Sequence, residues 1–526
     1  MKKWKNNISL IIFIVCLSVS CRADCMDVNQ SDSDSIHRVT DTIQSEDSTT
    51  AERIVFDIQQ NNIREIPAGK RVAFEWDVVG MYEGDTIFLT SDQELKGKYG
   101  WLRLTVAQEI WDSKKIDASV AGTEIDLGTF DIKYSSVLVP YEIQISNQYF
   151  DQIQQNGITL TLENSSSFWF YKTTSPESTG LVSHLLLSDT INGDINCFLD
   201  CFLSENSVQA FGWREGTVLD GLWQLYSKNN CEDALLTINK HFDLFFDSDS
   251  NLTYENSSSI PKYNSIDGIE STIPFATLAR LYPNHSILET VVEGWQSLKK
   301  DNGMIIDGTM VSAEGCYTIS YPMAVIGKAW DDEELISEAQ AQLQYRFVLI
   351  NNGNFYLRYD TGGQYSYCNW ARGAAWFLLG YIRTIEELGV ENVADNIIEK
   401  YKEAVDIAIS MQRESDGLWS CFMDDEDSLP DASGSAGIAA AVMSGINMEI
   451  LSSEYLENVE TCYKSLQDYI TPDGFLKGVA QDNRGGESLQ RSDYRVIAQM
   501  GMGMMAQLYA ALYQKEDGLF TKSMKR

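Results

Sequence analysis

The spacing of apolar residues changes once along the chain of 526 residues and so separates it into two parts. In residues 53–175 apolar and polar side chains alternate, as in 72–78 and 158–162, and turns such as Asn156-Gly157 separate the runs. Alternation with period two places one face of a strand in a core and the other in solvent. Many short strands joined by regular turns predict an antiparallel β-sandwich over 53–175. We expect it to buttress or space the rest of the chain, because no exposed row of aromatic residues is evident; glycan binding by this domain is the alternative.

From residue 176 onward the apolar period becomes helical, and Gly-centred turns recur at intervals of about 50 to 65 residues, the length of two helices with their loops. Each repeat predicts a helical hairpin, and about six hairpins in a ring predict an (α/α)6 toroid over 176–526. An open solenoid is the competing layout. Glycine-rich and aromatic loops recur at one end, as the rim of a pocket requires, and this favours the ring. The amphipathic runs cover 213–228, 231–246, 267–282, 286–300, 317–330, 332–350, 371–389, 395–413, 433–449, 454–469 and 489–514.

The N-terminus predicts a targeting segment. A basic start precedes the apolar stretch 8–19, which is too short to span a membrane as a stable helix, and 18–21 is similar to a loose bacterial lipobox. We expect a signal peptide over 1–21 with Cys21 as the lipidated residue; cleavage without lipidation is the alternative. Residues 22–52, rich in Asp, Ser and Thr, predict a disordered acidic tether. The predicted location is the bacterial outer membrane, through that lipid anchor alone, or the periplasm.

Composition and net charge limit the classes of molecule that the protein is expected to bind. The net charge of −36 and the pI of about 4.4 argue against nucleic acid, because phosphate binding needs basic surface. An acidic sugar would require a local cationic pocket. Seven of the ten cysteines follow Cys25, without a C-x-x-C pair, and the four histidines have no metal-ligand spacing. We therefore expect no disulfide framework and no metal site. The sequence implies no organic cofactor either.

The stretch 369–376 carries the first candidate binding residues. If a helix begins at Ala371, Arg372 and Trp376 share one face, while Trp370 lies on the entering loop. Indole faces beside a fixed cation suit a flat, negatively charged sugar such as a uronic acid, whose carboxylate a guanidinium can hold. Packing at a buried helix start is the alternative.

Asp267 and Glu270 are the first candidate catalytic residues. They lie three positions apart at a predicted helix start, and two carboxyls in a partly apolar pocket have their pKa values pushed apart, giving one proton donor and one ionised partner. Acid catalysis at a sugar's anomeric centre or enol ether needs this arrangement. A capping box is the alternative.

Further junctions between loops and helices carry the same residue types. Their recurrence at equivalent places in several hairpins favours a shared pocket over isolated salt-bridged caps. The candidates are Trp213 and Glu215 in 211–221, Glu314 in 311–317, Arg358 in 356–359, and Arg484 and Arg491 in 483–495.

The stretch 370–376, Trp-Ala-Arg-Gly-Ala-Ala-Trp, resembles the W-x-R-G-N-G-W signature of the unsaturated uronyl hydrolases, glycoside hydrolase families 88 and 105. Asp267-Gly268 with Pro274-Phe275 is similar to the segment that carries their catalytic Asp. The resemblance, over roughly 210–515, implies an (α/α)6 barrel in which Asp267 protonates the C4=C5 bond of a terminal unsaturated uronate. The same residue then helps water to add at C5, and the ring opens.

This chain departs from the family pattern. Ala374-Ala375 replaces the family's Asn-Gly, and the second acid expected near 247–255 has no match. Stretches 313–316, 431–437 and 490–495 also resemble the related family 154, which implies an exo-acting β-glucuronidase on saturated uronates.

We therefore predict an exo-acting hydrolase of terminal uronic acids on acidic oligosaccharides. In it Asp267 is the general acid/base, Glu270, Glu215 or Glu314 is its partner, and Arg358 or Arg484 holds the sugar carboxylate. The alternatives are a polysaccharide lyase, which the scarcity of histidine disfavours, and a non-catalytic surface glycan-binding lipoprotein.

Overall fold

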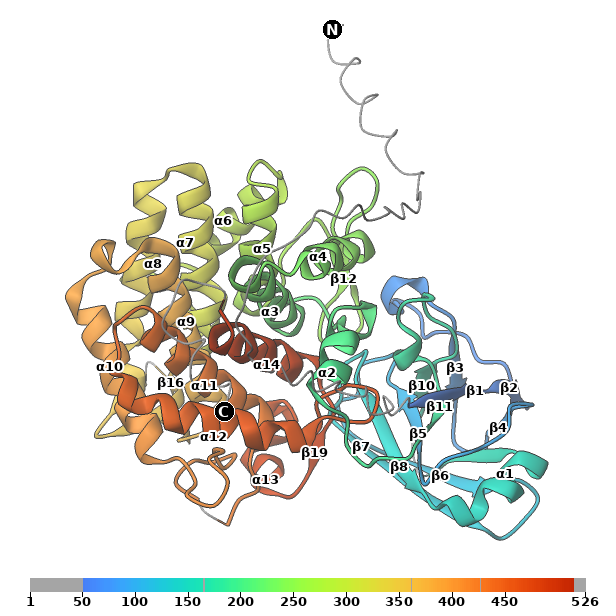
Figure 1. Ribbon diagram of the computed structural model, residues 1–526. Helices are drawn as coiled ribbons and strands as arrows, with labels where there is room; N and C mark the ends of the chain where they lie inside the picture. The colour runs from blue at the N-terminus through green and yellow to red at the C-terminus, as the bar shows by residue number, and fades with distance from the viewer. Residues whose placement is uncertain (1–50, 164–165, 361, 426, 515–526) are drawn as a thin grey trace, which may run out of the picture. The chain divides into compact units, whose positions relative to one another are not determined.

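The computed structural model describes residues 51–163, 166–360, 362–425 and 427–514. The predicted signal peptide, Cys21 and nearly all of the predicted tether lie outside these ranges. None of the helices in the described ranges combines the length and apolar character needed to cross a membrane. Figure 1 shows the strands gathered in the N-terminal part of the described chain and the helices in the rest.

The N-terminal part contains two main antiparallel sheets, as the alternating pattern predicts. The five-stranded sheet has the order β2 (Asp57–Gln60), β4 (Thr86–Thr90), β9 (Ile158–Glu163), β6 (Ser113–Val120), β7 (Asp126–Lys133). The four-stranded sheet has the order β1 (Glu52–Val55), β11 (His184–Ser188), β5 (Tyr99–Thr105), β8 (Pro140–Ile145), and β3 (Val78–Met81) pairs with β10 (Phe168–Tyr171). A short helix, α1 (Phe150–Asn156), precedes β9.

Strand β11 extends the sheet beyond residue 175, where the sequence places the end of the sandwich. All five of its residues are buried, so its apolar run does not alternate. A strand covered on both faces loses the period-two signal. The helical part covers one face of this sheet, because Arg103 of the neighbouring strand β5 forms an ion pair of 2.7 Å with Asp473. Asp473 also pairs with Arg53 at 3.0 Å.

The helical part is the predicted toroid. Six inner helices form a closed ring in which each contacts the next and the last contacts the first: α3 (Trp213–Asn229), α5 (Pro274–Leu281), α7 (Tyr321–Trp330), α9 (Ala371–Leu388), α11 (Ala432–Asn447) and α14 (Gln499–Leu512). Figure 1 shows α14 beside α3, where the ring closes.

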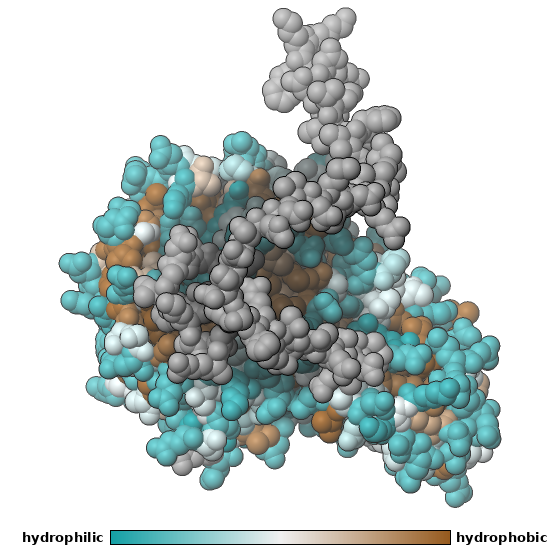
Figure 2. Space-filling model, in the orientation of Figure 1, coloured by the Kyte–Doolittle hydropathy of each residue, from teal (hydrophilic) through white to brown (hydrophobic). Residues whose placement is uncertain are grey.

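The outer helices lie around the ring and are amphipathic: α4 (Glu232–Phe245), α6 (Ile287–Leu298), α8 (Glu333–Tyr345), α10 (Asp395–Ser410) and α12 (Leu456–Leu466). Helix α2 (Ile195–Phe202) lies next to the turn that follows α12, since Gly474 abuts the backbone of Cys197. In the view of Figure 1, Figure 2 shows hydrophilic side chains along the outer edge of the molecule, with apolar residues between them.

Short hairpins and one short helix connect the hairpin repeats at one end. They are β12 (Thr253–Glu255) with β13 (Pro261–Tyr263), β14 (Met310–Ser312) with β16 (Asn354–Asp360), β15 (Ile350–Asn351) and β17 (Tyr365–Cys368), β18 (Val479–Ala480) with β19 (Arg495–Val496), and helix α13 (Gly486–Arg491).

Small residues allow the inner helices to approach closely. A Cβ on Gly221 of α3 would come within 2.6 Å of the carbonyl oxygen of Gly503 of α14, and a Cβ on Gly437 of α11 within 2.8 Å of the Ala375 Cβ of α9. The inner helices therefore pack closely at these points, and polar groups buried between them have to be satisfied within the protein.

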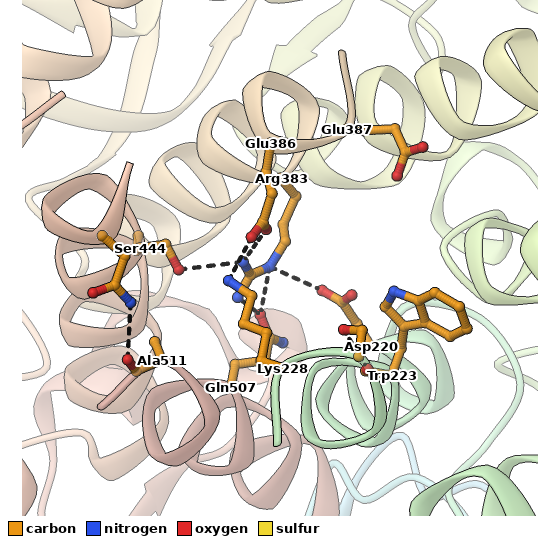
Figure 3. Close-up of polar contacts among 12 residues, drawn as sticks. Asp220, Trp223, Lys228, Arg383, Glu386, Glu387, Ser444, Gln507 and Ala511 are labelled. Atoms are coloured by element: carbon orange, nitrogen blue, oxygen red, sulfur yellow. Dashed lines mark hydrogen bonds and ion pairs between the residues drawn. The ribbon is translucent and has the colours of Figure 1, made fainter. Parts of the chain in front are cut away.

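A buried polar network centred on Arg383 of α9 links four inner helices (Figure 3). Its guanidinium donates to Gln507 of α14 at 3.0 Å and to Ser444 of α11 at 3.3 Å, and it pairs with Glu386 at 2.7 Å. Its Nε lies 3.5 Å from a carboxylate oxygen of Asp220 of α3. The network therefore bridges the ring at α3, α9, α11 and α14.

Gly380 marks another close approach, where α9 passes the π-helical turn Cys316–Ser320. A Cβ at Gly380 would come within 2.3 Å of the carbonyl carbon of Cys316, and backbone atoms cannot rotate away. We expect Gly380→Ala to lower the free energy of unfolding by about 1–3 kcal/mol, measured by urea denaturation. Gly373→Ala on the same helix is the matched control, because its Cβ would meet Leu357 at 3.4 Å, an ordinary contact. Equal losses in both variants would contradict the close-contact explanation.

Candidate active site

A cavity of about 320 Å³ opens at the end of the toroid where the inner helices begin. Its walls come from the starts of α3 and α9, the segments that precede α5, α7 and α14, strand β16 and one loop of the sandwich. The lining residues are Trp111, Trp213, Arg214, Ser257, Glu270, Ile273, Glu314, Thr318, Arg358, Trp370, Arg372, Trp376, Asp482, Asn483 and Arg484. Residues from junctions far apart in the sequence thus meet in one place.

Three indoles from the starts of two helices form an aromatic wall. Trp213 meets Trp376 edge to face, with ring centroids 5.4 Å apart. Trp376 stacks on buried Tyr317 at 5.9 Å, and Trp370 donates from its indole nitrogen to Gln490 at 3.2 Å. These contacts fix the rings, and fixed flat apolar surfaces suit the C–H face of a sugar.

Arg372 lines the cavity, and α9 begins at Ala371 as predicted, but its guanidinium already has protein partners. It donates to the carbonyl oxygens of Ala480 and Gln481, the latter at 2.5 Å, and lies 4.5 Å from the centre of the Trp370 ring. Its fractional exposure is 1%. This arginine therefore ties Trp370 to the segment before α14.

Glu270 and Glu314 are the two glutamates in the cavity wall. The Glu270 side chain is open to the solvent of the cavity, yet protein surrounds it closely enough to restrict its hydration. This enclosure, and secondly the negative charge of Glu314, raise the pKa of Glu270 to about 7, although Arg214 and Arg358 oppose the shift. Glu270 is therefore poised to exchange a proton near neutral pH.

Arginines surround the two glutamates. Arg358 of β16 lies 3.4 Å from a carboxylate oxygen of Glu314. Arg214 pairs with Asp482 at 2.5 Å and lies 4.2 Å from the centre of the Trp213 ring. With Arg372 and Arg484, four arginines face three acids among the described residues that line the cavity. The acidic protein thus contains the local cationic pocket that an acidic sugar requires.

Asp267 lies outside this set of lining residues. Its carboxylate pairs with Lys262 at 2.9 Å, its side chain is 36% exposed, and it lines a smaller hollow to which Glu270 also contributes. The predicted helix over 267–282 begins only at Pro274, because Gly268 has a φ of 69° and a 3-10 turn follows it. Asp267 and Glu270 therefore do not share a helix face or form a capping box.

Two other candidates lie elsewhere. Glu215 is fully buried, where its carboxylate contacts the imidazole of His241 at 2.8 Å and accepts from the backbone N–H of Gln209 at 2.8 Å. The Arg491 side chain is 41% exposed and pairs with Asp425 at 3.2 Å. Neither residue lines the cavity.

Sequence reasoning missed Asp482 and Trp111, and it did not select Arg214 as a site residue although Arg214 lies in the candidate stretch 211–221. Arg214 directly follows Trp213, a candidate, so its cationic side chain was a usable signal. Asp482 precedes the candidate Arg484. Trp111 gave no signal, because an isolated Trp in a loop of another domain shows no pattern that links it to a toroid. Among the described residues, no group of three or more His, Cys, Asp or Glu side chains is arranged to hold a metal ion.

A closed ring of helices around a cavity lined by indoles, arginines and two glutamates places the protein among the (α/α)6 toroids with a pocket at one end of the ring. Residues 199–516 match the model of Glycosyl Hydrolase Family 88, and the chain belongs to this family. The predicted membership is thereby confirmed for families 88 and 105; family 154 is not specifically indicated.

The chain is 25% identical over 207 residues to the unsaturated rhamnogalacturonyl hydrolase YesR of Bacillus subtilis (strain 168). That alignment covers 38% of this chain and 58% of YesR, so the chain spans little more than half the length of this relative.

Two solved structures share the fold. One is a family 105 glycoside hydrolase of C. acetobutylicum ATCC 824, at 17% identity and a TM-score of 0.51, covering 60% of this chain and 98% of that one. The other is a possible member of family 105 from Salmonella enterica serovar Paratyphi A, at 18% identity and a TM-score of 0.50, covering 62% of this chain and 85% of that one.

Proposed function

We propose that the protein is an exo-acting hydrolase that removes a terminal unsaturated uronic acid from acidic oligosaccharides. Membership of family 88 and the likeness to an unsaturated rhamnogalacturonyl hydrolase support the substrate class. The observation that carries the proposal is the pKa of Glu270, raised to about 7 inside a cavity lined by arginines and tryptophans.

The proposed reaction is hydration of the C4=C5 bond. Glu270 in its protonated form gives its proton to C4, and positive charge develops at C5, where the ring oxygen shares it. Water adds to C5, and a carboxylate, Glu270 itself or Glu314, takes the proton that this water loses. The product is a hemiketal at C5, which opens the ring and releases the rest of the oligosaccharide.

Arg358 is proposed to hold the carboxylate of the uronate. Its partner within the protein is Glu314, at 3.4 Å, a long contact that leaves guanidinium N–H groups for a ligand. We expect Arg358→Gln to raise KM by about 10- to 100-fold, because one charge-assisted pair is lost. Arg491→Gln, outside the cavity, is the matched control. An unchanged KM in Arg358→Gln would contradict this role.

A second candidate is hydrolysis of saturated β-glucuronides, as the resemblance to family 154 implies. The second carboxylate, Glu314, favours it, because hydration requires one acid/base group whereas hydrolysis of a saturated glycoside requires two carboxyls. In that reaction Glu270 protonates the glycosidic oxygen and Glu314 assists the attack at C1.

One screen tests these functions. The purified protein is incubated with unsaturated oligouronides and, separately, with an aryl β-glucuronide. Loss of the ultraviolet absorbance of the C4=C5 bond supports the proposed hydration, and aryl release alone supports the glucuronidase. A gain of absorbance from intact polymers indicates a lyase, although no His or Tyr is among the described residues that line the cavity. Binding without turnover indicates a glycan-binding protein.

A further inference from the structure

The rim of the cavity is completed by the sandwich. Trp111 belongs to the loop between β5 and β6, and it lines the cavity together with Ser257 and Arg484 of the helical part. Its fractional exposure is 52%, against 2% for Trp370 and 4% for Trp376. Trp370 and Trp376 are therefore packed in place, whereas Trp111 presents an open surface.

The Trp111 ring is held at the rim on two sides. Its indole N–H donates to the carbonyl oxygen of Ser257 at 2.8 Å, and the guanidinium of Arg484 lies 4.4 Å from the centre of the ring. The loop itself is anchored, because the backbone N–H of Glu109 donates to the hydroxyl of Ser259 at 2.8 Å and that of Ile110 donates to Ser135 at 2.8 Å. A large exposed side chain is thus held in one orientation.

Arg484 depends on the same loop. Besides lying over Trp111, it pairs with the buried carboxylate of Glu109, and it contacts Asp482 at 3.2 Å. The side chain of Arg484 is 9% exposed. Two residues of the sandwich therefore position a cation that faces the cavity, so the sandwich contributes to the site as well as packing against the toroid.

We propose that Trp111 is the platform for the sugar that follows the terminal uronate, so that the sandwich selects the saccharide to which the uronate is attached. This inference rests on the proposed function. The terminal uronate occupies the end of the cavity with Glu270 and Glu314, and an exo-acting enzyme has to leave the remaining sugars at the open rim. An exposed indole fixed at that rim offers its surface to the C–H face of a pyranose.

The test compares two substrates of different length. The methyl glycoside of an unsaturated uronate ends before the rim, whereas an unsaturated uronyl trisaccharide extends across it. In Trp111→Ala we expect the ratio of kcat/KM for the trisaccharide to that for the methyl glycoside to fall about tenfold, the effect of one lost ring contact. Trp111→Phe keeps an aromatic face and should restore most of the ratio.

Trp330→Ala is the matched control. Like Trp111, Trp330 donates from its indole N–H to a backbone carbonyl, that of Pro283, at 2.7 Å, but its side chain is partly buried and it does not line the cavity. The ratio should be unchanged in this variant.

An unchanged ratio in Trp111→Ala would overturn the platform. If both substrates lose activity equally, Trp111 acts only through Arg484, and if neither loses activity, Trp111 does not contribute to binding. If the wild type turns over neither substrate, the proposed function fails. The platform is then judged by calorimetric binding of the same two compounds, where a ratio of affinities that Trp111→Ala leaves unchanged overturns it.

Discussion

Glu270→Gln is expected to lower kcat by a factor of about 10² to 10⁴, because the amide cannot donate the proton that the double bond requires. The substitution keeps the size of the side chain and its place beside Glu314, so KM should change much less than kcat. Steady-state kinetics on an unsaturated oligouronide measure both constants.

The pH profile provides an independent signature of the same residue. A general acid acts when protonated, so with a pKa of about 7 for Glu270 the rate should be high below pH 7 and fall as the pH rises through it. This falling limb should be absent from the residual activity of Glu270→Gln. A limb that persists in the variant would assign it to another group.

The raised pKa of Glu270 should also make the stability of the fold depend on pH. The pKa of Glu270 in the folded state, about 7, exceeds its ordinary value of 4.5. Its contribution to stability is therefore fully present below pH 4.5 and is lost as the pH rises through 7. The melting temperature of Glu270→Gln relative to the wild type should accordingly increase between pH 5 and pH 8.

Asp267→Asn is the comparison that decides which carboxyl is the acid. Asp267 pairs with Lys262 and does not line the cavity, so we expect its variant to keep most of the activity. A hundredfold loss in Asp267→Asn, with near-normal turnover in Glu270→Gln, would transfer the role of acid to Asp267, the residue that the family resemblance favours.

Arg383→Met is expected to lower the free energy of unfolding by about 3–5 kcal/mol, because it leaves the buried carboxylate of Asp220 without the cation that pairs with it. Arg383 is 1% exposed, Asp220 is also buried, and Glu386 keeps only Lys228 as a cationic partner (Figure 3). Urea denaturation measures the loss. Arg491→Met, in an exposed pair with Asp425, is the control, and we expect a change of about 1 kcal/mol or less.

The Arg383 variant should also reduce activity in the fraction that remains folded. Asp220 accepts from the hydroxyls of Tyr317 and Tyr321, the latter at 2.6 Å, and Tyr317 stacks on Trp376 in the cavity wall. Without Arg383, Asp220 is held less firmly, and this disturbs Tyr317 and, through it, the position of Trp376 in the cavity wall. A destabilised variant whose kcat/KM is normal at low temperature would show that network and cavity are independent.

Periodicity predicted the elements whose surroundings are uniform along their length. Helices α3 and α9 begin at Trp213 and Ala371, as the apolar patterns indicate, and most of their residues are buried on every side. The run 267–282 is helical only from Pro274, since backbone geometry at Gly268 overrides an apolar pattern that extends further. Strand β11 escaped prediction because both of its faces are covered.

The site was predictable in its composition and less so in its arrangement. Recurring Trp, Arg and carboxyl residues at helix starts indicated a shared pocket, and eight of the candidates line it: Trp213, Glu270, Glu314, Arg358, Trp370, Arg372, Trp376 and Arg484. Spacing alone could not show that Arg372 is bound to carbonyl groups or that Asp267 turns towards Lys262. Such facts depend on how loops from separate repeats pack together.

The closure of the ring between α3 and α14 has a consequence for the order of folding. Gln209, just before α3, donates to Gln499 at the start of α14 at 2.6 Å, across 290 positions of sequence. Contacts this distant form late, after a large loss of chain entropy, and during synthesis the C-terminal partner is the last to leave the ribosome. Helix α3 therefore gains its contacts with α14 only after α14 has been synthesised, and the cavity wall at residues 482–484 is assembled late in the same process.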